Sequence, residues 1–410
     1  ISYFEKGINE IFCNSLNEKI QEKNPLGKIN IEGDQLKISN HFETPTVGIA
    51  AYHQSEFTIN KWDLTAGVRF NYEHVSIDYL SQNLINYAGE GIKDTEKKEL
   101  KTHFYGTKEL SEFVVLPKFA AQYNINKFNN LYLNIARGQK AGGYNVLLFS
   151  DIIQTQMINK INRELNLTGD RSELIKHDYT EEILYSPERC WNFEVGGHFL
   201  STEKNMSVNF ALFYILGQTQ QIHTFPTGSN MGSMIVNADR TRSVGGELSV
   251  NYTHVNPETQ NVFNIVGSYG YAHAKFLDFE HNGVDLSNKR LPFAPSNTIG
   301  LNACYTFLIN EPWVKTIAMN IAMNGNGKIY WDTENRYSQQ FYTTFDAGVT
   351  YNWKELYVRL WMRNLANKTY DTYQLSNLGN QICQKGKPRQ IGISINYKFK
   401  KRGYSSTLSC

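Results

Sequence analysis

The stretch that decides the fold is Pro388–Phe399, which reads PRQIGISINYKF. From Gln390 onward, polar and small residues alternate with Ile391, Ile393, Ile395 and the two aromatic residues that end the stretch, Tyr397 and Phe399. A repeat of two residues over this length predicts a β-strand with one polar and one apolar face. Aromatic side chains at the end of such a strand are typical of a membrane interface. The same pattern recurs about a dozen times upstream, so we predict one large sheet.

Composition is compatible with a sheet that crosses a membrane. Of 410 residues, 41% are hydrophobic and 13% aromatic, including 25 Tyr and 23 Phe. The longest apolar run, Phe210–Leu216, is far shorter than the roughly 18 residues that a spanning helix needs. In a membrane β-barrel only alternate residues face lipid, and aromatic girdles mark both interfaces. An aromatic-rich soluble β-protein would have a similar composition. The net charge of +2 favours neither nucleic acid nor an acidic partner.

The cysteines and the start of the chain carry little functional signal. The five cysteines are odd in number and contain no CxxC pair, so we predict neither a complete disulfide set nor a cysteine metal site. The chain opens at Ile1 without Met or a signal-peptide pattern. We therefore expect either a mature N-terminus or a missing upstream part.

The lengths of the predicted loops indicate how the chain is organised. Residues 1–44 are polar without a sustained period, and we interpret them as an extracellular loop region that could hold one hairpin, near Lys28–Ser39. Residues 45–399 hold about thirteen predicted strands, and residues 400–410 form a tail. Short turns alternate with long loops, which we place near 76–112, 146–187, 218–242, 278–296 and 325–339. This strict alternation is typical of an antiparallel up-and-down outer-membrane barrel and disfavours a sandwich or a propeller.

A series of motifs follows the predicted strands. They read ARGQKAGGYN at 136–145, WNFEVG at 191–196, NADRTRSVGGEL at 237–248, NKRLPFAP at 288–295 and RNLANKTY at 363–370. In this order, and together with the terminal strand, they resemble the motifs of TonB-dependent outer-membrane receptors. The resemblance covers roughly residues 44–399, and its specificity lies in the order, since no single motif is specific.

The resemblance implies a membrane barrel of about 22 strands closed around an N-terminal plug domain. Such a receptor binds a scarce nutrient with its outer loops and releases it inward when the TonB–ExbB–ExbD system acts on a TonB box. This chain shows no plug or TonB box and only about thirteen of those strands, and it continues beyond Phe399. An open sheet would leave two edges in lipid, so we expect a fragment of a longer protein. The implied partners include the lipid bilayer with its lipopolysaccharide, and the barrel assembly machinery, which would bind the terminal Tyr397 and Phe399.

Catalytic and metal motifs do not emerge from the sequence. It contains no GxSxG, HExxH, P-loop or CxxC, so we do not expect an enzyme. The ten His are dispersed without ligand spacing, and we expect neither a metal site nor a cofactor. Glu194 and Glu247 fall on inner faces of predicted strands. We expect them to pair with Arg69, Arg359 or Arg363 across the wall.

The candidate cargo contacts are Arg137, Lys140, Tyr144 and Asn145, which combine charge and an aromatic ring at one strand end. An Arg fork and a Tyr ring suit an anionic chelate or the face of a sugar. The alternative is structural: the Gly-Gly bend fixes the loop exit, and Arg137 pairs within the wall.

Three functions remain open from the sequence. We favour a Gram-negative outer-membrane receptor that imports a scarce nutrient, a ferric siderophore-type chelate, with energy from TonB. The second hypothesis is a passive porin-like or structural outer-membrane barrel, and the third is a soluble β-rich binding module. A plug and a TonB box upstream would separate the first two. Loops and plug determine the cargo, so the fold does not name it.

Overall fold

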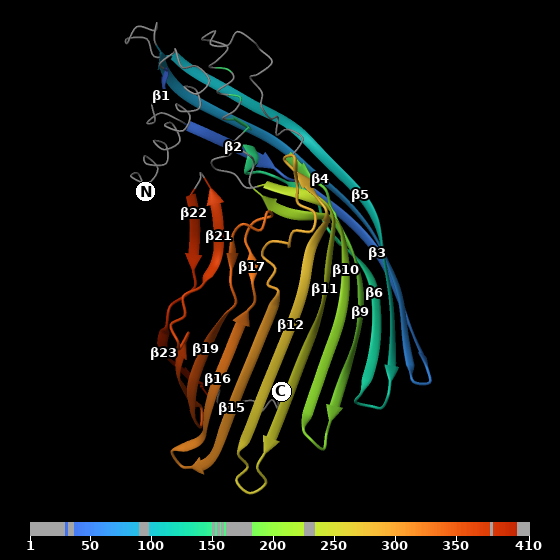
Figure 1. Ribbon diagram of the computed structural model, residues 1–410, viewed down its shortest axis with the longest axis vertical. Coiled ribbons are helices and arrows are strands. Elements are labelled where there is room, and N and C mark those ends of the chain that lie inside the picture. The colour runs from blue at the N-terminus through green and yellow to red at the C-terminus, as the bar shows by residue number, and fades with distance from the viewer. Residues whose placement is uncertain are drawn as a thin grey trace.

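The computed structural model describes residues 29–31, 37–89, 98–149, 152–153, 156, 160, 183–224, 234–377 and 380–399. Fifteen strands form one antiparallel sheet whose neighbours follow each other along the chain (Figure 1). Its long strands are β3 (Thr46–Ile59), β4 (Trp62–Gly89), β5 (Lys98–Asn124), β6 (Asn130–Lys140), β9 (Glu188–Ser201), β10 (Met206–Thr224), β11 (Met234–Val255), β12 (Val262–Asp278), β15 (Asn297–Glu311), β16 (Val314–Asn326), β19 (Tyr342–Trp353), β20 (Leu356–Arg363) and β23 (Gln390–Tyr397). The predicted all-β, antiparallel up-and-down fold is confirmed.

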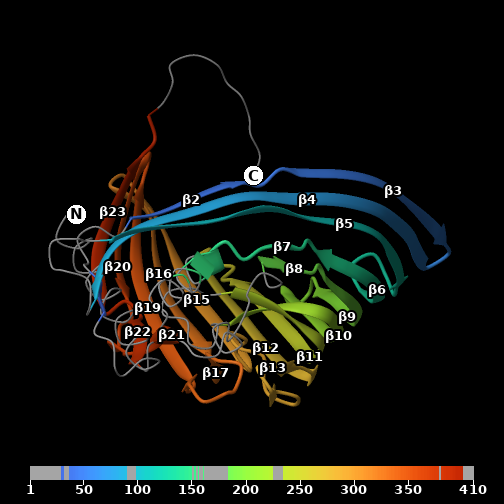
Figure 2. The same ribbon diagram turned by 90° about the horizontal axis from the view of Figure 1, so that it is seen from above.

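The sheet curves around an interior, as the view along the strands shows (Figure 2). Each strand from β4 to β23 pairs with its predecessor in the series, which is the order that up-and-down connections produce. Within the described residues, no helix has the length and apolar character to cross a membrane.

Two short strands at the start of the sheet differ from the predicted hairpin. β1 (Ile29–Ile31) and β2 (Lys37–Glu43) both pair with β4 and not with each other. Together with β3 they line one edge of β4 from its start to its end. Because β4 is long, its edge carries many backbone N–H and C=O groups that need hydrogen-bond partners. β1, β2 and β3 provide these partners along successive parts of the edge. Residues 1–28 and 32–36 of the predicted loop region 1–44, and the tail 400–410, lie outside the described residues.

The two faces of the sheet differ in polarity, because neighbouring residues of a strand point to opposite sides. On one face, large apolar side chains are exposed; Leu360 of β20 and its register partner Ile393 of β23 are each 58% exposed. On the other face lie polar residues such as Arg359 and its partner Ser394. The structure thus exposes its apolar side chains on the outer face and turns polar side chains toward the interior. A membrane barrel with a wet interior has this arrangement.

Short turns lie at one end of the sheet, at the bottom of Figure 1, and long connections lie at the other. The turns between β3 and β4, β9 and β10, and β19 and β20 place Asn60, Asn205 and Lys354 at φ of 55°, 49° and 48°. Asn tolerates this left-handed region better than most residues, which explains its use in tight turns. At the other end, four small two-stranded sheets form within the long connections: β7 (Gly143–Tyr144) with β8 (Leu184–Tyr185), β13 (Glu280–His281) with β14 (Val284–Asp285), β17 (Ile329–Tyr330) with β18 (Ser338–Gln339), and β21 (Asp371–Asn377) with β22 (Asn380–Lys385).

Two of the predicted long loops are wrong. Most of 76–112 continues β4 and β5, whose register runs without interruption from Trp62↔Tyr123 to Tyr87↔Lys98. Most of 218–242 likewise continues β10 and β11 as far as Thr224↔Met234. The 28 residues of β4 extend about 90 Å at 3.3 Å per residue, whereas a membrane crossing needs about 10 residues. Backbone pairing continues beyond the apolar band, because ladder hydrogen bonds do not require apolar side chains.

The strand extensions bury two small cores at the long-loop end. The first contains Ile77, Tyr79, Leu148, Phe149, Ile152, Ile183 and Met234. The second contains Ile222, Ala238, Ala274, Phe276, Phe279, Leu286 and Leu291. Phe149 and Phe276 are completely buried. These cores attach the loops to the extended strands and fix the shape of this end of the molecule.

Candidate binding site

The motif at residues 136–145 forms the end of β6 and the bend into β7. Gly142 and Gly143 lie at this bend, and a Cβ on Gly142 would come within 2.7 Å of both Leu110 and the carbonyl oxygen of Tyr185. The side chain of Tyr185 covers Gly143 in the same way. The two glycines are therefore required because the returning segment packs directly on the backbone.

Two of the predicted cargo residues hold this bend in place. The hydroxyl of Tyr144 donates to the carbonyl oxygen of Ser76, on β4, at 2.7 Å. The amide of Asn145, which is 5% exposed, donates to the carbonyl oxygen of Ile235 at 2.9 Å and accepts from its N–H at 2.7 Å. Tyr144 also packs against the first core. Both side chains thus join the loop to strands that are distant in sequence.

The other two predicted residues lie on opposite faces of β6. Arg137 is the register partner of Trp191, in the alternating series that also places Leu133 opposite Val195 on the exposed apolar face. Its guanidinium donates to the carbonyl oxygen of Val115. Lys140 is exposed and lies opposite Glu188. The structure therefore brings the four predicted residues to one strand end but does not direct them toward one point.

Replacement of Asn145 by alanine is expected to destabilise the 143–149 segment by about 2–3 kcal/mol, because it leaves the part-buried N–H and C=O of Ile235 without these partners. Amide hydrogen exchange at Ile235 and Leu148 measures the effect. Lys140→Ala, at an exposed position, should change exchange there by less than about 0.5 kcal/mol. Unchanged protection of Ile235 in Asn145→Ala would contradict a structural role for this side chain.

A buried carboxylate beside this bend was not singled out in the sequence. Glu112 has a side chain that is 10% exposed, and it forms an ion pair with Arg189. Its other oxygen accepts a hydrogen bond from Gln139 at 2.8 Å. Three strands, β5, β6 and β9, thus meet at one fully partnered carboxylate. The sequence offered no signal for this group, since the three residues are separated by long segments.

The other motifs also contribute asparagines that bind backbone groups. Asn237 accepts from the N–H of Ser186 at 2.8 Å and donates to the carbonyl oxygens of Ser186 and Thr219. Asn335, which lies outside the motifs, binds Arg290 of the 288–295 motif: it accepts from the N–H of Arg290 and donates to its carbonyl oxygen, at 2.7 and 2.9 Å. These side chains fix the exits from the strands. The motif residues therefore stabilise the architecture of the long-loop end, and they do not indicate a particular cargo.

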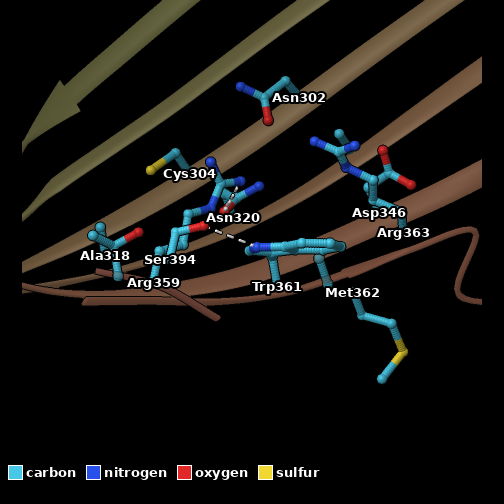
Figure 3. A pocket seen from close by; sticks show the side chains of 13 residues that line it. Asn302, Cys304, Ala318, Asn320, Asp346, Arg359, Trp361, Met362, Arg363 and Ser394 are labelled. Atoms are coloured by element: carbon cyan, nitrogen blue, oxygen red, sulfur yellow. Dashed lines mark hydrogen bonds between the residues drawn. The ribbon is translucent and has the colours of Figure 1, made fainter. Parts of the chain in front are cut away.

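The interior face of β15, β16, β19, β20 and β23 encloses a cavity of about 520 Å³ (Figure 3). Its polar lining includes Asn320, Asp346, Arg359, Arg363 and Ser394. Alternation places these side chains on one face, whereas Met362 points to the other side of the sheet (Figure 3). The cavity offers cationic guanidinium groups, amides, a carboxylate and a hydroxyl to whatever occupies the interior.

Glycine makes room for the large side chains of this cavity. The indole of Trp361 lies over Gly392 of the neighbouring strand and donates to the hydroxyl of Ser394 at 3.1 Å. Its ring also stacks beneath Arg363, with 4.9 Å between the guanidinium carbon and the ring centroid. Aromatic cover of a cross-strand glycine stabilises a sheet and holds the indole flat against the wall. The cation–π contact positions Arg363 at the rim of the cavity.

The ion pairs expected for the inner carboxylates are not those observed. Glu194 accepts a hydrogen bond from the hydroxyl of Tyr132 at 2.9 Å. Arg359 donates to Asn320 at 3.4 Å, and Arg69 donates to Asn71 at 3.3 Å. Among the described residues, no ion pair joins Glu194 or Glu247 to an arginine. Glu194, Arg359 and Arg69 thus have neutral side chains as hydrogen-bond partners.

In the part of the chain that the structure describes, no three His, Cys, Asp or Glu side chains come together in a group that could hold a metal ion. Cys190, Cys304 and Cys383 are free thiols there.

A pH-sensitive ion pair stabilises the β21–β22 hairpin. Burial alone raises the pKa of Asp371, but hydrogen bonds from Lys385 and Gln374, with the charge of Lys385, bring it below its usual 3.8. A carboxyl with a depressed pKa contributes stability above its unfolded pKa and loses it as the pH falls through the folded value. We expect amide protection in the hairpin, corrected for intrinsic exchange, to be constant from about pH 7 to 5 and to fall below about pH 4. Asp371→Asn should abolish this dependence.

Together, the exposed apolar outer face, the polar interior face and the sorting of turns and loops define the wall of a transmembrane β-barrel. A family model described as "TonB dependent receptor-like, beta-barrel" matches residues 18–365. The chain belongs to this family, as the sequence motifs indicated.

Several individual proteins are similar to the chain. The pesticin receptors of Yersinia enterocolitica and Yersinia pestis are 21% and 20% identical to it over 354 residues, which is 86% of this chain and 44% of theirs. The chain therefore spans less than half the length of these curated relatives. The crystal structure of the ferric yersiniabactin uptake receptor FyuA from Yersinia pestis has a TM-score of 0.64 at 20% identity, and the match covers 88% of this chain and 47% of FyuA. The unliganded ferric citrate transporter FecA has a TM-score of 0.54 at 14% identity, with 91% and 59% covered. These relatives are named as receptors and transporters rather than as enzymes.

Proposed function

We propose that this chain is the C-terminal barrel part of an outer-membrane receptor that binds a ferric siderophore-type chelate and imports it with energy from TonB. The family match over residues 18–365 carries the proposal, because it falls on a wall with the two faces that such a barrel needs. The receptors named for ferric yersiniabactin and ferric citrate share this fold and give the cargo class.

The interior cavity supports an import pathway through the barrel. Arg359, Arg363 and the amide of Asn320 line it, so the inner wall presents donors rather than a dry packed core. A plug domain would occupy this interior, and its release would open the path. The energy step would come from the TonB–ExbB–ExbD system. Within the Gram-negative outer membrane, the barrel assembly machinery would bind the terminal strand at Tyr397 and Phe399, which are 55% and 87% exposed.

At the mouth of the barrel, the proposed cargo contact of this chain is Lys140, with Tyr144 and Asn145 fixing the bend beside it, whereas Arg137 lies on the opposite face of β6. Lys140 is exposed at the end of β6, beside the bend that Tyr144 and Asn145 fix. An ammonium group at this position suits the negative charge of many ferric chelates. The hydrogen bonds of Tyr144 and Asn145, which hold the bend, would then keep Lys140 in a fixed position.

Uptake of radioactive iron tests the proposal. The gene that carries this chain, with its flanking coding sequence, is expressed in a Gram-negative host without other receptors for the probes, and iron is supplied as ferric yersiniabactin or ferric citrate. Uptake in a host with TonB and loss of uptake without TonB would support it. Uptake that persists without TonB would favour a passive barrel instead. Lack of uptake and of binding for ferric chelates of either type would overturn the assignment of the cargo.

A further inference from the structure

The outer face of β11 and β12 carries a row of cations that ion pairs do not explain. Arg242 on β11 lies opposite Lys275 on β12 in the register. Lys275 in turn forms a β-bridge with Arg290, which lies beside β12 on its other edge. Three cationic residues are thus direct neighbours across three adjacent backbone segments. Like charges in this position repel one another and destabilise a sheet unless an anion lies between them.

Alternation places this row on the outer face. Two and four residues toward the short-turn end, Val244 and Gly246 of β11 lie opposite His273 and Tyr271 of β12. Val244 and Tyr271 belong to the exposed apolar side chains. Ala274 and Phe276, which flank Lys275 in β12 and point to the other face, are buried in the second core. The cations therefore continue the lipid-facing surface beyond its apolar part.

Hydrogen bonds fix the row but do not neutralise it. Lys275 donates to the amide oxygen of Asn288 at 2.7 Å. Arg290 donates to the carbonyl oxygen of Ala272 at 2.9 Å and contacts the ring of His273. The Nε of Arg242 is buried without a hydrogen-bond partner among the described residues. The carboxylate of Asp278 pairs with Arg240, and no ion pair in the described part of the chain involves the three cations of the row.

A second observation lies directly beneath the row. The outer surface has an apolar hollow of about 510 Å³, and Phe210, Leu212, Val244, Leu248, Tyr269 and Tyr271 line it. Gly246 lies on the same face as Val244 and Leu248 and contributes no side chain to the hollow. A cationic row above an apolar hollow matches one kind of molecule, in which a phosphate group is attached to acyl chains.

We propose that Arg242, Lys275 and Arg290 bind the phosphate of a lipid headgroup, with an acyl chain of the same lipid in the hollow beneath. The site rests on the proposed outer-membrane location, in which the long-loop end faces the outer leaflet. Arginine forks and a lysine ammonium are suited to phosphate oxygens. The lipid would supply the counter-charge that the protein lacks at this row, so bound lipid should also stabilise β11 and β12.

Native mass spectrometry of the full chain in detergent micelles tests the proposal. The probes are a bisphosphorylated diglucosamine lipid, the same lipid without phosphates, and inorganic phosphate. Each cation near an anionic lipid surface contributes roughly fivefold in affinity, so Arg242→Gln with Lys275→Gln should bind the phosphorylated lipid about 30-fold more weakly. Arg242→Lys with Lys275→Arg should retain binding. Lys127→Gln with Lys204→Gln removes the same charge from exposed turns at the opposite end, and its binding should stay within about twofold of the unmodified chain.

The outcomes separate this site from the proposed transport function. Equal binding by the unmodified chain and the glutamine pair would overturn the site, as would equal binding of the lipid without phosphates. Displacement of the lipid by an equal concentration of inorganic phosphate would show a site for free phosphate and overturn the lipid assignment. Lipid binding is measured without cargo or TonB, so a failure of iron uptake leaves it unaffected. Loss of lipid binding in the glutamine pair with unchanged iron uptake would support the site alone.

Discussion

Arginine in place of Leu360 is expected to destabilise the folded chain in a lipid bilayer by about 2–4 kcal/mol. Leu360 is 58% exposed on the outer face and lies opposite Ile393, which is equally exposed. In a membrane both side chains contact acyl chains, and a guanidinium at that depth loses its hydration. Equilibrium unfolding in urea, with the chain in phospholipid vesicles, measures the change.

The matched control places the same arginine on the inner face. Ala322 lines the interior cavity and lies opposite Asp346 in the register. Ala322→Arg should change the unfolding free energy by less than about 1 kcal/mol, because water and a carboxylate are available there. If Leu360→Arg were as mild as Ala322→Arg in vesicles, the assignment of the outer face to lipid would be wrong.

Asn364→Ala is the second large effect, with an expected loss of about 3–4 kcal/mol. Asn364 is 5% exposed, and its side chain donates to the carbonyl oxygens of Lys368 and Lys387 at 2.9 and 3.0 Å. It also accepts from the N–H of Lys368 at 2.8 Å. The substitution leaves three part-buried backbone groups of Lys368 and Lys387 without these partners. In addition, φ of 47° at this position costs alanine about 1 kcal/mol.

Asn364→Gly separates the two causes. Glycine tolerates the positive φ but also lacks the side-chain hydrogen bonds, so it should recover only about 1 kcal/mol relative to alanine. Hydrogen exchange across residues 364–389 measures the loss locally, and urea unfolding measures it globally. Full recovery by glycine would show that backbone strain, and not the asparagine side chain, sets the stability of this strand exit.

Particular residues show why the sequence predicted the wall but misjudged its length. In β10, Phe210, Leu212 and Tyr214 alternate with small and polar residues, and this pattern is a direct consequence of lipid on one side. In the extension of β4, Val75, Ile77 and Tyr79 also alternate and are buried. Charged neighbours such as Asp78 obscured this pattern, so the segment was predicted as a loop. Only the packing of Leu148, Phe149 and Ile152 against it explains which face is buried.

The candidate site was predictable in position but not in role. The motif at 136–145 indicated a strand end with a glycine bend, and the structure has both. No pattern in the sequence indicates that Asn145 binds the backbone of Ile235, which is 90 residues away. Such pairing depends on β6 and β11 being brought to one end of the sheet. The same is true of the cationic row, since Arg242, Lys275 and Arg290 are neighbours only through strand register.

The sequence by itself determined the fold class, the strand order and the two faces of the wall. These properties are local, because alternation records the environment of each strand and short turns force neighbouring strands to pair. The tertiary structure decided how far the strands extend, which asparagines close the strand exits, and which charges become neighbours. These properties depend on register and on contacts between segments far apart in the chain, and no local pattern of residues encodes them.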